Sequence, residues 1–283
     1  MQLPPSPEEL QELCVKLARE AAALVVKQRD FLAKHGSIAQ VTSTKTSEVD
    51  PVTAVDKASE AHIVKQLREL RPEDAIVGEE GSDIAGTTGV SWVIDPIDGT
   101  VNFLYGLPAY AVSVGAAVNG EFVAGCVVNV ANSDCYYAAS GSGAWVERGG
   151  EVRKLRASRA DELATSLVAT GFAYDAAWRE KQADLLRLVL PRVRDIRRFG
   201  SAALDLCHLA EGGVDAYYEH GTHPWDYAAG AVIAAEAGAT VRHPGLKDRG
   251  GEGALTAAAA PRVWEAFREL LESSGASNPL EGT

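Results

Sequence analysis

The order of strands and helices expected along the 283 residues changes near residue 158, and this change limits the architectures open to the chain. Before it, two amphipathic patterns at residues 7–31 and 50–70 precede short apolar segments joined by Asn-Gly, Gly-Ser-Gly and Gly-Gly turns, which are typical of β-hairpins. After it, strand and helix patterns alternate. The sequence therefore predicts an N-terminal α+β subdomain over residues 1–158, with two helices against an antiparallel sheet, and a C-terminal α/β subdomain over residues 159–283.

An apolar segment that stops at acidic residues gives the first sign of chemistry. Residues 92–94 are aromatic or β-branched and are expected to form a short buried strand, which Pro96 would end because proline cannot donate a ladder hydrogen bond. Asp95 would then lie at the end of the strand, and Asp98 would precede a short helix that begins near Gly99. The first N–H groups of a helix lack partners within it, so this helix start is a candidate anion site.

A second apolar segment, residues 75–77, runs into Glu79 and Glu80. Adjacent strands lie about 4.8 Å apart, so Glu79 and Asp95 would come within reach of one shared ion if the two strands are neighbours. A phosphate beside Asp95 and Asp98 would meet a repulsion of roughly 4 kcal/mol for each charge pair about 4 Å apart at an effective dielectric of ~20. A divalent cation removes this conflict, and an all-oxygen ligand set favours Mg²⁺, with Mn²⁺ as a substitute, over Zn²⁺.

Each of these features also has a purely structural explanation. Asp98-Gly99 is a common turn dipeptide, and Asp95 could serve as a helix cap. Gly200 stands in a tight strand-to-helix turn that would let a ligand approach the backbone, and plain connection geometry explains it equally well. The motifs therefore have to be weighed in combination.

Composition and charge exclude several classes of protein. The net charge is −12 and there is no Lys/Arg-rich run, which argues against a nucleic-acid-binding surface. There is no apolar run long enough to cross a membrane and no signal-peptide pattern at the N-terminus, so we expect a cytoplasmic protein without membrane or nucleic-acid partners. The four cysteines lack Cys-x-x-Cys spacing and are expected to be buried free thiols. Gly221 and Pro224 prevent His220 and His223 from sharing a helix face, which disfavours a zinc site.

Four segments that contain acidic residues are spread along the chain. They are Asp50-Pro51-Val52-Thr53-Ala54-Val55-Asp56, Glu79-Glu80, Asp95-Pro96-Ile97-Asp98-Gly99-Thr100 and Trp225-Asp226. In combination they resemble the inositol monophosphatase family of Mg²⁺-dependent, lithium-sensitive phosphatases. The resemblance extends from about residue 10 to residue 271, and within the family the chain is most similar to bacterial inositol-1-monophosphatases. It implies a layered αβαβα sandwich, commonly a homodimer.

The resemblance also implies a site for two or three Mg²⁺ ions. The implied metal ligands are Glu79, Asp95, the backbone carbonyl of Ile97, Asp98 and Asp226. Thr100, hydrogen-bonded to Asp56, and Glu79 would orient the attacking water and take its proton. The implied substrate contacts are Lys45, Asp98, Gly99, Thr100, Gly200, Ser201, Ala202, Glu219 and Asp226.

The function implied by the resemblance is Mg²⁺-dependent hydrolysis of inositol 1-phosphate to inositol and phosphate, by in-line attack of a metal-activated water and without a covalent phosphoenzyme. Fructose 1,6-bisphosphate, histidinol phosphate and 3′-phosphoadenosine 5′-phosphate are alternative substrates, and a regulatory binding role is a further alternative. Glu219 favours a polyol, because a carboxylate accepts two hydroxyl donors and repels a second phosphate. The haloacid-dehalogenase phosphatases, which form a phosphoaspartate, separate their two acids by one residue, whereas Asp95 and Asp98 are separated by two.

Overall fold

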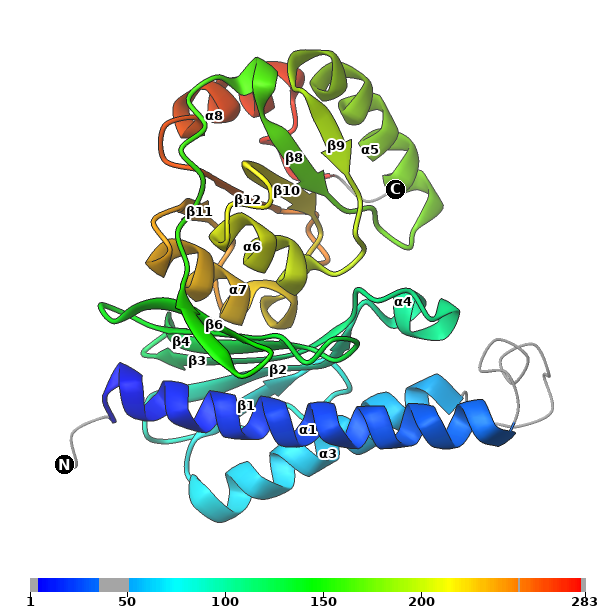
Figure 1. Cartoon of the computed structure of the whole chain (residues 1–283), viewed down its shortest axis with the longest axis vertical. Coiled ribbons are helices and arrows are strands. Elements are labelled where there is room, and N and C mark those ends of the chain that lie inside the picture. The colour runs from blue at the N-terminus through cyan, green and yellow to red at the C-terminus, as the bar shows by residue number, and fades with distance from the viewer. Residues whose placement is uncertain (1–4, 36–50, 249, 281–283) are drawn as a thin grey trace.

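The computed structural model describes residues 5–35, 51–248 and 250–280, and its helices and sheets alternate in five layers (Figure 1). The predicted αβαβα sandwich is therefore confirmed. In the described part of the chain, no helix is both long and apolar enough to span a membrane. From the N-terminal side, the layers are α1 (Pro7–His35) with α3 (Pro51–Leu70), a seven-stranded sheet, α6 (Ala202–Ala210) with α7 (Pro224–Glu236), a five-stranded sheet, and α5 (Ala176–Val189) with α8 (Trp264–Ser274).

The seven-stranded sheet follows the chain order from β1 to β7. β1 is parallel to β2, and every other neighbouring pair is antiparallel. This confirms the predicted hairpin around Asn119-Gly120. The two strands that run into Glu79 and Asp95 are neighbours, as expected. The strands are β1 (Ala75–Gly78), β2 (Val90–Asp98), β3 (Ala111–Val118), β4 (Glu121–Asn129), β5 (Cys135–Ala139), β6 (Gly143–Arg148) and β7 (Glu151–Lys154).

The prediction that the second of these strands ends at Pro96 is wrong, because β2 continues to Asp98. The register with β3 shifts between Asp95 and Asp98, and an irregularity of this kind tolerates a proline that a regular ladder would not. A short helix, α4 (Thr100–Tyr105), follows directly. Gly99 precedes it with φ 90°, a left-handed conformation that favours glycine.

The five-stranded sheet has the order β11-β12-β10-β8-β9. β8 is parallel to both β9 and β10, whereas β12 is antiparallel to β10 and β11. The strands are β8 (Leu167–Thr170), β9 (Asp195–Arg197), β10 (Ala216–His220), β11 (Thr240–Arg242) and β12 (Leu255–Ala259), and two 3-10 turns span Leu163–Thr165 and Leu190–Arg192. The predicted α/β alternation of this half is confirmed.

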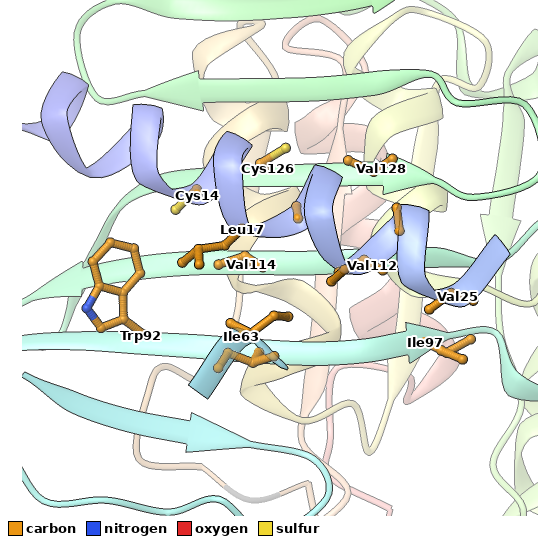
Figure 2. Close-up of a cluster of buried hydrophobic side chains, with 14 of the residues drawn as sticks. Cys14, Leu17, Val25, Ile63, Trp92, Ile97, Val112, Val114, Cys126 and Val128 are labelled. Carbon is orange, nitrogen blue, oxygen red and sulfur yellow. The ribbon is translucent and has the colours of Figure 1, made fainter. Parts of the chain in front are cut away.

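The core of the N-terminal half lies between its two helices and the large sheet. Leu17 and Val25 of α1 and Ile63 of α3 face Trp92 and Val114 of the sheet (Figure 2), and all five side chains are fully buried. Full burial of one such side chain contributes about 1.5–3 kcal/mol relative to exposure. This packing holds the strands whose ends carry the acidic residues.

On the opposite face of the sheet, two glycines allow α7 to lie directly on the strands. A Cβ atom on Gly125 would lie 2.5 Å from the Cα atom of Ala229, and one on Gly115 would lie 2.9 Å from the Cβ atom of Ala228. Only glycine fits at such distances. The close approach brings the N-terminus of α7, with Asp226, to the region where β2 ends.

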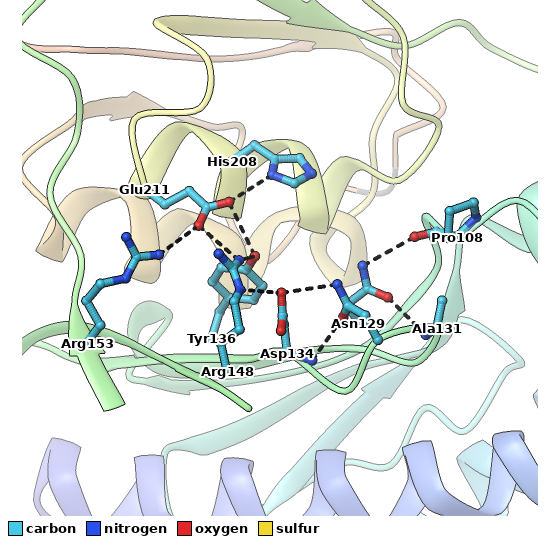
Figure 3. Close-up of polar contacts among 10 residues, drawn as sticks. Pro108, Asn129, Ala131, Asp134, Tyr136, Arg148, Arg153, His208 and Glu211 are labelled. Atoms are coloured by element: carbon cyan, nitrogen blue, oxygen red, sulfur yellow. Dashed lines mark hydrogen bonds and ion pairs between the residues drawn. The ribbon is translucent and has the colours of Figure 1, made fainter. Parts of the chain in front are cut away.

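A polar network ties the large sheet to the end of α6 (Figure 3). Arg148 of β6 contacts Asp134 Oδ2 at 2.7 Å and Glu211 Oε2 at 3.1 Å, and His208 Nδ1 lies 3.2 Å from Glu211 Oε1. Tyr136 Oη accepts a hydrogen bond from Arg148 Nη2 at 2.8 Å. The two halves are therefore joined by paired charges as well as by apolar packing. The boundary near residue 158 stays a prediction.

The described residues that follow α8, up to residue 280, pack against the rest of the fold. Ala276 is fully buried, and the Leu280 N–H donates to the Gly253 carbonyl at 2.9 Å. His220 Nε2 lies 2.7 Å from the Ala276 carbonyl oxygen, so this nitrogen is engaged by the tail rather than available to a metal. The tail thereby supports the end of β10.

Candidate active site

A cavity of about 430 Å³ opens where the end of β2, the start of α6, the end of β10 and the start of α7 meet. Both halves of the chain contribute to its lining. The predicted site residues that line it are Glu79, Asp95, Ile97, Asp98, Gly99, Thr100, Gly200, Ser201, Ala202, Glu219 and Asp226. The structure thus brings together residues as far apart in the sequence as Glu79 and Asp226, which are separated by 147 positions.

Two predicted site residues are not part of this lining. Asp56 lies on α3 with 4 % exposure, and Lys45 lies outside the described residues. Thr100 Oγ1 donates to the Ile97 carbonyl at 3.1 Å. The hydrogen bond expected between Thr100 and Asp56 stays a prediction, as does the role of Lys45.

The sheet register places Glu79 and Asp95 side by side. Gly78 pairs with Ile94 across the parallel strands, and the Glu79 N–H donates to the Ile94 carbonyl at 3.2 Å. One residue further, Asp95 Oδ1 accepts a hydrogen bond from the Ile97 N–H at 3.0 Å, which orients the carboxylate within the irregular part of β2. The two acids therefore reach the cavity from adjacent strands.

Helix starts hold the other two acids. Asp98 Oδ2 accepts hydrogen bonds from Ser201 Oγ at 2.6 Å and from the Ala203 N–H at 2.7 Å, so the start of α6 fixes it. Asp226 Oδ2 accepts from the His223 N–H at 2.7 Å. His223 caps α7, and Asp226 is the third helical residue of a capping box.

The start of α7 is also tied to the strand that faces Asp95. Ser113 of β3 is the partner of Asp95 in the register, and its Oγ donates to the Trp225 carbonyl at 3.4 Å. A shift of α7 would therefore move both Asp226 and the strand opposite Asp95. This hydrogen bond links the strand next to Asp95 to the start of the helix that carries Asp226.

The crowding of these acids changes their proton affinity. Burial raises the pKa of Glu79 to about 7 and that of Asp98 to about 8, and the charge of Asp226 adds to both shifts. Burial and the neighbouring Glu79 carboxylate raise the pKa of Asp95 well above its ordinary value. Burial and mutual repulsion therefore oppose full ionisation of these groups at neutral pH, and a bound cation would offset that repulsion.

The donor set fits a hard divalent cation. The oxygen atoms of Glu79, Asp95, Asp98 and Asp226 and the carbonyl of Ile97 are the ligand type that Mg²⁺ and Mn²⁺ prefer. Over the described ranges 5–35, 51–248 and 250–280, the side chains of His, Cys, Asp and Glu form no group of three or more already placed to hold a metal ion.

One part of the cavity wall is built around Glu219 of β10. Its Oε2 accepts a hydrogen bond from Tyr217 Oη at 3.0 Å, and burial followed by the charge of Asp226 raises its pKa to about 7. Gly171, just after β8, lies so close to the carboxylate that any side chain there would collide with it. In the sequence, the only indication that another group lies close to the backbone here is the glycine that follows Thr170 at the end of the strand.

Arg198 is a lining residue that the sequence did not point to. Arg198 is exposed, and its guanidinium lies so close to Gly200 that a side chain at position 200 would collide with it. Its positive charge lowers the pKa of Glu219 and so offsets part of the rise that burial causes. Trp178 and Tyr174 line the same side of the cavity. An arginine on a strand end is usually solvated, so only the fold reveals that this one faces the site.

Comparisons with known proteins identify the family of the chain. The model of the inositol monophosphatase family matches residues 6–278. The inositol-1-monophosphatase SuhB of Mycobacterium tuberculosis is 49 % identical over 97 % of this chain and 96 % of its own length. The Nus factor SuhB of Vibrio cholerae is 35 % identical over 95 % of this chain and 98 % of its own length. A solved structure of Mycobacterium tuberculosis SuhB has a TM-score of 0.82 at 46 % identity, with 96 % of this chain and 98 % of that chain covered. The chain therefore belongs to the inositol monophosphatase family and is a phosphatase.

Proposed function

We propose that the protein is a Mg²⁺-dependent phosphomonoesterase that hydrolyses inositol 1-phosphate to inositol and phosphate. The observation that carries this proposal is the convergence of Glu79, Asp95, Asp98 and Asp226 on one cavity, with Glu219 on another part of its wall. The names of the mycobacterial relatives support the substrate. We also propose, from the family resemblance, a cytoplasmic homodimer that is inhibited by lithium.

Glu79, Asp95, Asp98, Asp226 and the Ile97 carbonyl would hold the cation or cations. When bound, such ions neutralise the phosphate, lower the pKa of a water and stabilise the leaving oxygen. The hydrogen bonds from Ser201 and Ala203 to Asp98 keep that carboxylate in one orientation, so the Asp98 side chain would lose little conformational freedom when a cation binds.

Thr100 and Glu79 are the groups we assign to the attacking water. Thr100 Oγ1 donates its own proton to the Ile97 carbonyl, so its lone pairs can accept a hydrogen bond from the water. Glu79 then takes the proton as the oxygen attacks phosphorus in line with the leaving oxygen. Gly99 and Thr100 would bind the phosphate oxygens through their backbone N–H groups. Asp56 would orient Thr100 by accepting its hydroxyl proton in place of the Ile97 carbonyl, which would then be free to bind a cation.

The inositol ring would lie between Glu219 and the start of α6. The Glu219 carboxylate, oriented by Tyr217, can accept two hydroxyl donors, and the backbone of residues 200–202 forms the facing wall. Lys45 would approach from outside the described residues. The test is phosphate release from inositol 1-phosphate, measured against fructose 1,6-bisphosphate, histidinol phosphate and 3′-phosphoadenosine 5′-phosphate. A clear preference for one of the other three compounds would overturn the substrate assignment.

A regulatory binding role is the second candidate. It is favoured by the relatives that bear the name Nus factor SuhB, one of which is 35 % identical to this chain. A complex with a macromolecular partner that forms equally well with and without Mg²⁺, from a protein that releases no phosphate, would favour this role. The preserved set of acidic residues makes hydrolysis the better-supported function.

A further inference from the structure

Two thiols on neighbouring strands of the large sheet are in contact, and neither lines the candidate active site. Cys126 Sγ of β4 and Cys135 Sγ of β5 lie 3.5 Å apart. Cys135 is opposite Val128 in the register, so Cys126 is its diagonal neighbour on the same face of the sheet. All four cysteines lie in the described part of the chain, and this is the one pair of them in hydrogen-bond contact there.

A second cavity gives access to one of these two thiols. It has a volume of about 390 Å³ and lies between α1 and the strands β4 to β6, and Cys135 is part of its lining, together with Arg19 and Glu147. Cys126 is fully buried behind Cys135 and does not line the cavity. A small molecule that enters from solvent therefore meets Cys135 first.

The surroundings of Cys135 favour its thiolate. Arg19 is held at the cavity by Glu147, with Nη2 to Oε2 at 2.6 Å and Nη1 to Oε1 at 3.3 Å. The hydrogen bond from Cys126 and the positive charge of Arg19 lower the pKa of Cys135, whereas burial raises the pKa of Cys126 well above its ordinary value. A thiolate is the nucleophilic form of cysteine, so the two sulfurs have different chemical roles.

We propose that Cys135 and Cys126 form a dithiol site at which a hydroperoxide is reduced and the two sulfurs are joined in a disulfide. In the first step the Cys135 thiolate attacks the terminal peroxide oxygen and the O–O bond breaks. The products are a sulfenic acid and the leaving oxyanion, which for hydrogen peroxide is hydroxide and takes a proton to become water. In the second step the Cys126 sulfur attacks the Cys135 sulfur, the S–O bond breaks and a second water leaves with the thiol proton. The two sulfurs supply the two electrons that the peroxide gains.

The second step requires the two sulfurs to approach each other and, because the pair is diagonal across the strands, a local adjustment of the backbone. A disulfide bond is about 2.05 Å long, so the two sulfurs must approach by about 1.5 Å from their present separation of 3.5 Å. Cys14 of α1 belongs to the same buried cluster as Cys126 (Figure 2), but among the described residues the sulfur-to-sulfur hydrogen-bond contact joins Cys126 to Cys135. Cys135 is therefore the partner that the geometry selects, and the site is independent of the phosphatase activity.

The test is a count of free thiols and an intact mass after exposure of the folded protein to hydrogen peroxide. We expect the count to fall from four to two, with a mass loss of about 2 Da and full recovery with dithiothreitol. Peptide mapping should show Cys126 linked to Cys135. A count that remains at four, or a disulfide that joins any other pair, would overturn the proposal.

Two variants separate this site from general oxidation of buried thiols. Cys126→Ala should give a protein oxidised at Cys135 without any intramolecular link, because the second thiol is missing. Cys207→Ala is the matched control, since Cys207 is equally buried but lies on α6, and it should form the disulfide as the wild type does. Equal disulfide formation in both variants would contradict the proposal, and circular dichroism would verify that each is folded.

Discussion

At the scale of single residues, the site brings together acidic side chains that repel one another, and nearby hydrogen-bond donors hold them in place. Asp98 keeps a fixed orientation because Ser201 and Ala203 donate to the same oxygen, and Asp226 is held by the backbone of His223. These contacts hold the side chains at the positions where a cation would be bound. Under the proposed function, the site requires the charge of each carboxylate as well as its position.

Replacement of Asp98 or Asp226 by Asn tests this requirement. Each change keeps the size of the side chain and removes one negative charge from the proposed ligand set, so we expect the rate of phosphate release to fall by roughly 10²-fold or more. Asp184→Asn, an exposed acid on α5, is the matched control and should retain wild-type activity. Near-normal hydrolysis by either Asn variant, with circular dichroism unchanged, would contradict the assignment.

Arg198 leads to a prediction about substrates with a second anionic group. The carboxylate of Glu219 repels such a group, and the nearby guanidinium offsets this repulsion. In Arg198→Gln, we expect kcat/KM for fructose 1,6-bisphosphate to fall about tenfold more than kcat/KM for inositol 1-phosphate. Arg198→Lys should retain part of the difference. Equal losses for the two substrates would show that Arg198 does not discriminate between them.

At the scale of elements, most of the architecture could be predicted because each element has its own local pattern. The hairpin at Asn119-Gly120, the paired acid-terminated strands and the α/β alternation all follow from turn residues and apolar periodicity. The irregular end of β2 could not be predicted, because the tolerance for Pro96 depends on the register with β3. Burial of Leu280 likewise depends on Gly253, a partner that only the folded chain brings near.

The start of α6 gives a prediction at this scale. Ser201 Oγ accepts from the Leu204 N–H at 3.3 Å as the N-cap and donates to Asp98, so one side chain both caps the helix and orients the acid. Ser201→Ala should lower the free energy of unfolding by about 1 kcal/mol and also reduce activity. Ser6→Ala removes an analogous cap from α1, where Ser6 Oγ accepts from the Glu9 N–H at 3.2 Å, and should change stability alone. Urea unfolding and phosphate release measured on both variants would decide this, and unchanged activity in Ser201→Ala would contradict the role.

At the scale of the whole molecule, the site is a shared product of both halves. The N-terminal sheet supplies Glu79, Asp95 and Asp98, and the C-terminal half supplies Glu219 and Asp226. The sequence predicted these acids because the family resemblance joined segments that no local pattern connects. It could not predict Arg198, because the side of the fold that an arginine faces depends on the packing of α6 against the strands around it.

The crowded acids make the stability of the whole molecule depend on pH. In the metal-free protein, Glu79 and Asp98 hold protons up to about pH 7 and 8, whereas the unfolded chain releases them near the ordinary values of 4.5 and 3.8. The folded state therefore binds more protons in this window, and the free energy of unfolding should fall as the pH rises from about 4 to 8. Urea midpoints with a chelator should show this fall. Added Mg²⁺ should raise the midpoint more at pH 8 than at pH 5, and an equal rise at both would contradict the account.

The most direct test of the proposed function is phosphate release from inositol 1-phosphate by the chelator-treated protein as Mg²⁺ is added back. We predict no release above the uncatalysed rate in the chelated protein, a saturable recovery with Mg²⁺, and no recovery in Asp98→Asn at the same concentrations. Hydrolysis that continues at the full rate after complete removal of divalent cations would contradict the account.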